Sequence, residues 1–255
     1  MNRLLPLLLL ALPLFFSSCG DDEPEMKETT TLTLNAKASF GDQPLVMFED
    51  IYDYQGQPLQ LQLFQIYLTD IYLTYEENGQ EREQLVTDVV LANYAEVFST
   101  NDAEAGLDLL EVEVPARNYT GLKVGLGVSP ELNATIPPDY ELTHPLSQNY
   151  WEDASSYIFF KIEGNTDVDG DGELSDKLTF HVGGDNNFRK AAFDKTIDLM
   201  PNTDATLQLG IDLEKVMLSA DGEFLDFANV RQAHSTTSPA AVFMGENLSR
   251  AVGLE

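Results

Sequence analysis

Hydrophobic and polar residues alternate along most of the chain, with the period of two that β-strands show when one face is buried. Four segments carry the alternation most clearly, and each is predicted to be a strand: Leu32 to Phe40, Leu59 to Leu68, Leu122 to Val128 and Leu207 to Leu213. In the second segment the alternation slips by one residue between Leu63 and Phe64, which predicts a β-bulge there. The pairs Asn78-Gly79 and Asp221-Gly222 are typical of tight turns between strands.

One helix is predicted close to the end of the chain. Ser238 can cap its N-terminus and Pro239 fits its first turn. Apolar residues follow at helical spacing: Ala240, Ala241, Met244, Leu248 and Ala251. Segments 41–58 and 129–156 have mixed composition and are predicted to be loops, which on a rigid β scaffold commonly carry functional sites.

The predicted strands are not interleaved with helices, so the pattern indicates an all-β fold rather than a βαβ fold. We expect an antiparallel β-sandwich with Greek-key or immunoglobulin-like connections and a short C-terminal helix. No linker rich in proline and serine interrupts this part of the chain. Residues 31–255 are therefore expected to form one domain.

The first thirty residues have the features of a lipoprotein leader. Residues 1–18 contain Arg3 and then a long apolar run, as secretory signal peptides do. Cys19 is the chain's only cysteine and follows two serines, an arrangement that resembles the bacterial lipobox, in which cleavage leaves the cysteine to be acylated. The alternative is an ordinary signal peptide followed by an unpaired cysteine.

An acidic tether is predicted at residues 19–30, directly after the leader. It begins Gly20-Asp-Asp-Glu-Pro-Glu25 and resembles the acidic signal that sends lipoproteins of Bacteroidetes to the cell surface. We therefore expect a lipid anchor in the outer membrane, with the protein exposed at the cell surface or, in the second reading, facing the periplasm.

The chain is strongly acidic. It has 43 acidic and 14 basic residues, which give a net charge of −29. Such a charge repels polyanions and excludes nucleic acid as a partner. It also favours the accumulation of cations, although acidity of this kind does not by itself indicate a metal site.

The three histidines are the candidate metal ligands. In the strand at 178–182, His181 points to the face opposite Leu178 and Phe180. His144 and His234 are predicted to lie in loops. Neutral imidazole is a strong ligand for copper, zinc and nickel, but one histidine cannot hold such an ion alone, so the fold would have to bring these rings together.

Short motifs distributed over the chain resemble those of the MbnP-like proteins, in the same order. The motifs are Phe64 to Leu73, Leu126-Gly-Val128 with Asn133, Tyr150-Trp151 before Tyr157, Lys161-Ile-Glu-Gly164 and Phe180-His-Val-Gly183. His234 occupies the place where that family tends to have a histidine before its closing helix. The resemblance implies a secreted or lipid-anchored β-sandwich that binds copper outside the cytoplasm.

The resemblance also implies which residues surround the copper. In characterised relatives, paired imidazoles and a tryptophan oxidised to kynurenine by a dihaem peroxidase-like partner form the site. Carried over to this chain, the ligands are His181 and His234, with His144 as a further contributor and Trp151 as the residue open to oxidation. The family commonly reads Met-x-Trp-x-Trp in this turn, whereas this chain reads Asn149-Tyr-Trp-Glu-Asp153. Trp151 could equally be an aromatic plug at the end of the sandwich.

A second candidate metal site is independent of that resemblance. The run Asp167-Val-Asp-Gly-Asp-Gly-Glu resembles the first half of an EF-hand loop, whose hard oxygen ligands suit calcium. The candidate ligands are the side chains of Asp167, Asp169 and Asp171, the carbonyl of Glu173, and Asp176 closing the shell because Leu178 stands at position twelve. We expect calcium to brace the connection into the His181 strand. The alternative is a merely acidic hairpin.

The sequence gives little support for catalysis. It has no Gly-x-Ser-x-Gly elbow, no His-Glu-x-x-His motif and no phosphate-binding loop. The chain is therefore predicted not to be an enzyme. The resemblance to the MbnP-like proteins instead implies a membrane-anchored copper-binding lipoprotein, with a dihaem peroxidase-like protein or a transporter as its partner. Two alternatives are a calcium-braced adhesion module of the cell envelope and a redox enzyme that uses oxidised Trp151.

Overall fold

The computed structural model describes residues 28–255. The expected signal peptide, Cys19 and most of the acidic tether lie outside these residues. Among residues 28–255, no helix has both the length and the apolar character needed to cross a bilayer.

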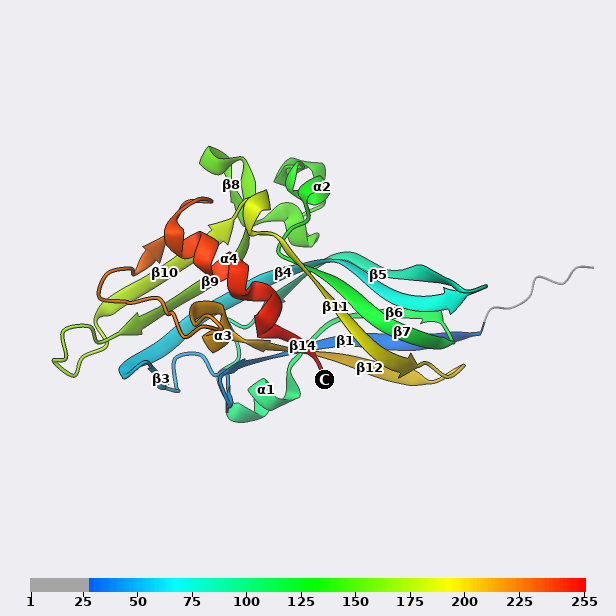
Figure 1. Cartoon of the computed structure of the whole chain (residues 1–255), viewed down its shortest axis with the longest axis horizontal. Helices are drawn as coiled ribbons and strands as arrows, with labels where there is room; N and C mark the ends of the chain where they lie inside the picture. Colours follow the sequence, from blue (N-terminus) through cyan, green and yellow to red (C-terminus); the bar gives the residue numbers. More distant parts are fainter. Residues whose placement is uncertain (1–27) are drawn as a thin grey trace, which may run out of the picture.

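Strands dominate the structure, and short helices connect them (Figure 1). The strands are β1 (Thr29–Phe40), β2 (Gln43–Pro44), β3 (Tyr52–Tyr54), β4 (Gln57–Glu77), β5 (Gln80–Asn93), β6 (Leu107–Pro115), β7 (Asn118–Leu126), β8 (Tyr150–Trp151), β9 (Ser156–Thr166), β10 (Asp176–Gly183), β11 (Arg189–Asp198), β12 (Asp204–Asp212), β13 (Gln232–Ala233) and β14 (Val252–Leu254). The helices are α1 (Thr100–Ala105), α2 (Pro130–Asn133), α3 (Leu213–Met217) and α4 (Pro239–Ala251), with 3-10 turns η1 (Pro137–Asp139), η2 (Pro145–Ser147), η3 (Glu152–Ala154) and η4 (Asp185–Asn187).

The strands form two sheets that enclose the core. In the five-stranded sheet the order is β14-β12-β1-β2, with β6 also paired to β1. The nine-stranded sheet has the order β11-β7-β4-β9-β10-β13, with β3 and β5 paired to β4 and β8 paired to β9. Alternate residues of the strands point inward, as the pattern predicted: Leu32, Leu34 and Ala36 of β1 are fully buried, and so are Leu59 and Leu61 of β4. The prediction of a mostly β, sandwich-like fold is confirmed.

The expectation of purely antiparallel sheets was wrong. β1 and β12 run parallel over nine residue pairs, from Thr31↔Asp204 to Ser39↔Asp212. β10 and β13 are also parallel. Both sheets are therefore mixed. Alternation reports which face of a strand is buried but carries no information on strand direction, so this error could not be detected in the sequence.

Local predictions in the long strand β4 agree better with the structure. Asn78-Gly79 forms the two-residue turn into β5, with positive φ at both positions, as a tight hairpin requires. The register against β9 shifts between Leu61 and Leu63, so the predicted bulge exists one to two residues earlier than expected. A second shift beside Asp70, which has φ of 47°, was not predicted.

The C-terminal helix α4 begins where the sequence predicted. The Ser238 side chain accepts a hydrogen bond from the Ala241 N–H, and Pro239 occupies the first turn. The apolar face, which includes Met244 and Leu248, is buried against α3, β10 and β11. Helix α3 was not predicted: Leu213 continues the strand alternation, but the Asp212 side chain accepts a hydrogen bond from the Glu214 N–H and ends β12 by capping a helical turn.

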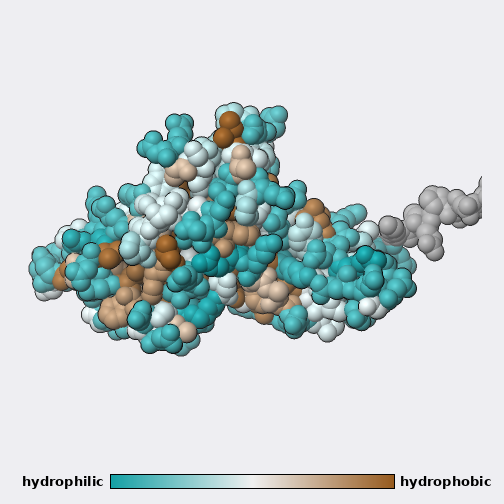
Figure 2. All heavy atoms as spheres, turned by 45° about the horizontal axis from the view of Figure 1, so that its top comes forward, coloured by the Kyte–Doolittle hydropathy of each residue, from teal (hydrophilic) through white to brown (hydrophobic). Residues whose placement is uncertain are grey.

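One face of the molecule is mainly hydrophilic, in keeping with the acid-rich composition. Figure 2 shows hydrophilic residues over most of one face, with smaller apolar areas in its left half and near its middle.

Buried tyrosines link strands to loops through their hydroxyl groups, and Tyr94 is the exception among them. The Tyr54 hydroxyl donates to the Met217 carbonyl at 2.7 Å and accepts from the Leu225 N–H at 3.0 Å. The Tyr94 ring stacks on Phe64, but within the described residues its hydroxyl has no hydrogen-bond partner. A buried polar atom without a partner destabilises the folded state.

We therefore expect Tyr94→Phe to raise the free energy of unfolding by about 1 kcal/mol, because it removes the unpaired hydroxyl and keeps the ring. The measurement is urea unfolding followed by circular dichroism. Tyr54→Phe is the matched control and should lower the free energy of unfolding by about 1–2 kcal/mol, because it removes two hydrogen bonds. Destabilisation by Tyr94→Phe would show that its hydroxyl is paired.

Candidate metal centre

Strand register brings two histidines that are 53 positions apart into contact. β13 pairs in parallel with β10, with Thr179 opposite Gln232 and Phe180 opposite Ala233. Continuing this register by one residue places His234 beside His181. The two imidazole rings have centroids 5.0 Å apart and an interplanar angle of 33°.

This separation suits a shared ion. A ring nitrogen binds a metal at about 2.0 Å, which places the ring centroid about 3 Å from the ion, so two rings on one ion lie at most about 6 Å apart. The rings line a cavity of about 370 Å³ together with Trp151 and Ile158. The structure therefore brings together three of the four predicted copper-site residues: His181, His234 and Trp151.

Contacts on both sides of His234 fix it beside β10. Before it in the sequence, Arg231 forms an ion pair with Asp176, and its carbonyl accepts from the Thr179 N–H at 2.9 Å. After it, the carbonyl of Thr236 accepts hydrogen bonds from the side chains of Asn186 at 3.0 Å and Asn187 at 2.8 Å. Asn187 is fully buried, so its hydrogen bond ties the segment after His234 to the core.

The Trp151 side of the cavity is a short hairpin. Tyr150 and Trp151 of β8 pair with Tyr157 and Ser156 of β9. Asn149 precedes the hairpin with φ of 58°, a left-handed conformation that asparagine tolerates better than most residues. Asn149 thus has a structural role in this turn.

Lys161 holds the start of this hairpin against β9. It lies opposite His181 in the register of β9 and β10, and its Nζ donates to the Asn149 Oδ1 at 2.6 Å. Burial lowers the pKa of Lys161. The hydrogen bond to Asn149 directs the ammonium group toward the turn that carries Trp151.

A buried hydrogen-bond network joins the hairpin to the ends of the neighbouring strands. The side-chain oxygen of Asn133 accepts from the Tyr157 N–H at 2.8 Å and from the Ser156 hydroxyl at 3.1 Å. The Ser156 hydroxyl oxygen in turn accepts from the Gly184 N–H at 2.9 Å. The Asn133 amide donates to Asp185 at 2.8 Å. The network thus fixes α2, the start of β9 and the end of β10 relative to one another.

His181 is hydrogen-bonded to a carboxylate that the sequence analysis did not assign. Its Nε2 lies 2.7 Å from Oε1 of Glu163. Burial lowers the pKa of His181 and outweighs the opposing effect of Glu163, which favours the neutral ring. In that form the contact is a hydrogen bond between a neutral imidazole and a carboxylate rather than an ion pair. A neutral imidazole is the form that binds metal.

His144 does not join the other two histidines. Its ring stacks on Tyr140 with centroids 4.1 Å apart, and its Nδ1 accepts from the Leu146 N–H at 3.1 Å. It does not line the cavity of His181 and His234. These two contacts stabilise the loop around η2. The sequence predicted that His144 lies in a loop but did not predict these contacts.

The acidic loop gathers three of its five predicted calcium ligands. One ligand oxygen from each of Asp167, Asp169 and Asp171 lies within 4.8 Å of the others. Within residues 28–255 this is the only such group of three acidic, histidine or cysteine ligands. Hydrogen bonds from backbone N–H groups, first that of Gly172, lower the pKa of Asp167.

The other two predicted calcium ligands have different partners. The Asp176 carboxylate pairs with Arg231 and accepts from the Val168 N–H, and the carbonyl of Glu173 accepts from the Ser175 N–H at 2.8 Å. Asp176 therefore joins both the His234 segment and the backbone of the acidic loop to β10, and it is not part of the group of three close ligand oxygens.

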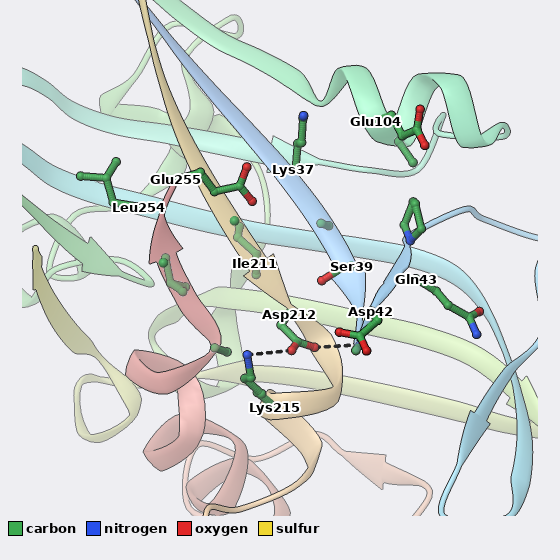
Figure 3. Close-up of a pocket in the computed structure, with 18 of the residues that line it drawn as sticks. Lys37, Ser39, Asp42, Gln43, Glu104, Ile211, Asp212, Lys215, Leu254 and Glu255 are labelled. Carbon is green, nitrogen blue, oxygen red and sulfur yellow. Dashed lines mark hydrogen bonds and ion pairs between the residues drawn. The ribbon is translucent and has the colours of Figure 1, made fainter.

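A larger cavity on the five-stranded sheet is built differently. It has a volume of about 540 Å³ and lies beside β1, β12 and the C-terminal strand β14 (Figure 3). Its central carboxylate, Asp212, pairs with Lys215 at 3.1 Å and accepts from the Gly41 N–H at 3.0 Å. Asp212 also caps α3, so these charged groups hold local structure together rather than converge on a ligand.

Sequence reasoning missed Glu163 and Asn187 as residues that position the site. Glu163 stands two residues after Lys161, on the same polar face of its strand, and this spacing was visible. Its contact with His181 depends on the register between β9 and β10, which the sequence does not reveal. No pattern in the sequence marked Asn187.

Fold and site together define a class: a two-sheet β protein with a paired-histidine cavity beside a tryptophan, at the edge of its larger sheet. The chain belongs to the MbnP family, whose model, described as MbnP, matches residues 29–238. This confirms the resemblance inferred from the short motifs.

Among solved structures, the chain is similar to MbnP from Methylosinus trichosporium, with a TM-score of 0.53 and 12% sequence identity. The match covers 84% of this chain and 87% of the other. At this identity the similarity shows the fold alone. No curated protein sequence matches the chain.

Proposed function

We propose that this protein binds copper outside the cytoplasm through His181 and His234, as a lipid-anchored member of the MbnP family. The observation that carries the proposal is the 5.0 Å separation of two imidazole rings in a cavity shared with Trp151. The family is associated with copper and the methanobactin system, which supports copper as the metal. No catalytic activity is part of the proposal.

The residues present fit copper. Divalent copper binds imidazole nitrogen more strongly than the other divalent first-row metals do. Burial lowers the pKa of His181, which favours the neutral ring that binds metal, and the hydrogen bond to Glu163 holds the ring in position. The pair supplies two nitrogen ligands, and the remaining positions would be filled from solvent or by an oxidised Trp151. Copper would supply a strongly bound, redox-active centre at this edge of the sheet.

The partner and the location are part of the same proposal. A dihaem peroxidase-like protein encoded with methanobactin systems would be the partner that oxidises Trp151, and a transporter is the alternative. Cys19 would carry the lipid, and the acidic segment after it would send the protein to the outer surface of the outer membrane. Both features lie outside the described residues.

We further propose that the loop of Asp167, Asp169 and Asp171 holds calcium. Their oxygen atoms already lie within 4.8 Å of one another, and hard carboxylate oxygens suit that ion. The loop leads into β10, which carries His181, so bound calcium would brace that strand. If calcium binds and copper does not, the chain is better described as a calcium-braced binding module of the cell envelope.

Elemental analysis of the natively exported protein, together with its intact mass, tests these proposals in one sample. We expect copper at one ion per chain, and a mass that includes the acyl chains and any oxygen added to Trp151. Calcium should also be present, and Asp171→Asn should lower calcium while leaving copper unchanged. Protein without copper after exposure to copper(II) would overturn the main proposal.

A further inference from the structure

Glu163 approaches His181 from the side away from His234. β10 lies between β9 and β13 in the sheet, so Glu163 on β9 and His234 after β13 flank the His181 ring on opposite sides. Glu163 is the register partner of Thr179, two residues before His181, and therefore lies on the same face of the sheet. Its Oε1 is 2.7 Å from Nε2 of His181.

The chemistry of this contact fixes the position of the ring proton. An ionised carboxylate can only accept hydrogen bonds, so Nε2 of His181 must be the donor. A neutral imidazole carries one proton on its two nitrogens. Nδ1 of His181 is therefore the nitrogen with the free lone pair, and a metal ion needs that lone pair.

Lys161 does not compete for this carboxylate. Its register places it directly opposite His181, close enough in sequence to Glu163 to pair with it. Its Nζ instead donates to Asn149 at 2.6 Å, toward the Trp151 hairpin. Glu163 thus remains bonded to His181, with 37% of its side chain exposed.

The geometry points to Glu163 as a positioning residue that selects Nδ1 of His181 as the metal-binding nitrogen, an inference that rests on the proposed metal site. A carboxylate that accepts the other ring N–H fixes the orientation of a histidine ligand and increases its basicity. Removing such a partner lowers metal affinity by about 10–100-fold. Glu163 touches no metal in this arrangement and acts only through His181.

The first measurement uses metal-free protein labelled with ¹⁵N. Long-range ¹H–¹⁵N correlation spectra at pH 7.5 should show His181 as a single tautomer protonated at Nε2. Glu163→Gln should keep this tautomer, because the Gln carbonyl can also accept the hydrogen bond. In Glu163→Ala, a mixture that includes the Nδ1-protonated form should appear. A wild-type ring protonated at Nδ1 would overturn the inference, whatever metal the protein binds.

The second measurement adds zinc(II), a diamagnetic probe for imidazole sites. On binding, the Nδ1 resonance of His181 should shift while Nε2 keeps its proton, and loss of the Nε2 proton would contradict the inference. Glu163→Ala should weaken copper(II) binding by about 10–100-fold, and Glu163→Gln should recover part of it. Glu113→Gln on β6 of the other sheet makes the same change in net charge and should have no effect.

The tautomer measurement and the metal-binding measurement test the proposed metal site and the positioning role of Glu163 separately. If neither zinc nor copper binds the wild-type protein, the proposed function fails, while the tautomer of the metal-free ring still decides the role of Glu163. If metal binds with equal affinity to the wild type and to folded Glu163→Ala, the metal site stands and the positioning role is wrong.

Discussion

His181→Ala should weaken copper(II) binding by more than about 100-fold, because it removes one of only two adjacent imidazoles. Loss of a hydrogen-bond partner of a ligand already costs about 10–100-fold, and loss of the ligand itself must cost more. His234→Ala should have a similar effect. Competition with a chelator of known affinity, followed by the visible spectrum of the chelator, measures the change.

His144→Ala is the matched control for both variants. It also removes one imidazole, but its ring stacks on Tyr140 and lies outside the cavity of the other two histidines. Copper affinity should therefore be the same as in the wild type. Equal losses in all three variants would indicate nonspecific binding to surface histidines, and no loss in His181→Ala would remove the proposed site.

Asn133→Ala should lower the free energy of unfolding by about 2–3 kcal/mol, because it leaves the buried Tyr157 N–H without a partner and opens the network around Ser156. In a protein of this size the melting temperature should fall by about 5–10 °C, which differential scanning calorimetry can measure. The network also joins the start of β9 to the end of β10, so copper affinity should fall as well.

Asn165→Ala provides the comparison, since Asn165 lies on the same strand β9 with a half-buried side chain that makes no hydrogen bond in the described part of the chain. Its melting temperature should stay close to that of the wild type. If Asn133→Ala melts like Asn165→Ala, the network does not stabilise this end of the sheet.

The local features of the chain could be read from its sequence with good accuracy. The inward faces of β1, β4 and β10 follow from a period of two, and the start of α4 follows from Ser238 and Pro239. Such features depend on residues close together in the chain, whose chemistry is visible in any window of the sequence. The histidines were recognised as candidate ligands for the same reason.

The relation between distant segments could not be read in this way. Alternation predicted the strand that carries His181 but not that β13 would pair beside it, and it gave no means of separating His234 from His144. Asp176 looked like a calcium ligand because it follows the acidic loop in sequence. In the fold it pairs with Arg231, 55 positions away.

By itself, then, the sequence determined an acidic, mostly β protein that carries candidate metal ligands and the motifs of its family. Only the tertiary structure decided which imidazoles meet, which carboxylate contacts His181 and which side chains hold the neighbouring strands together. The physical reason is that hydrophobic periodicity depends on neighbours a few residues apart, whereas strand direction, order and register depend on the packing of the whole core.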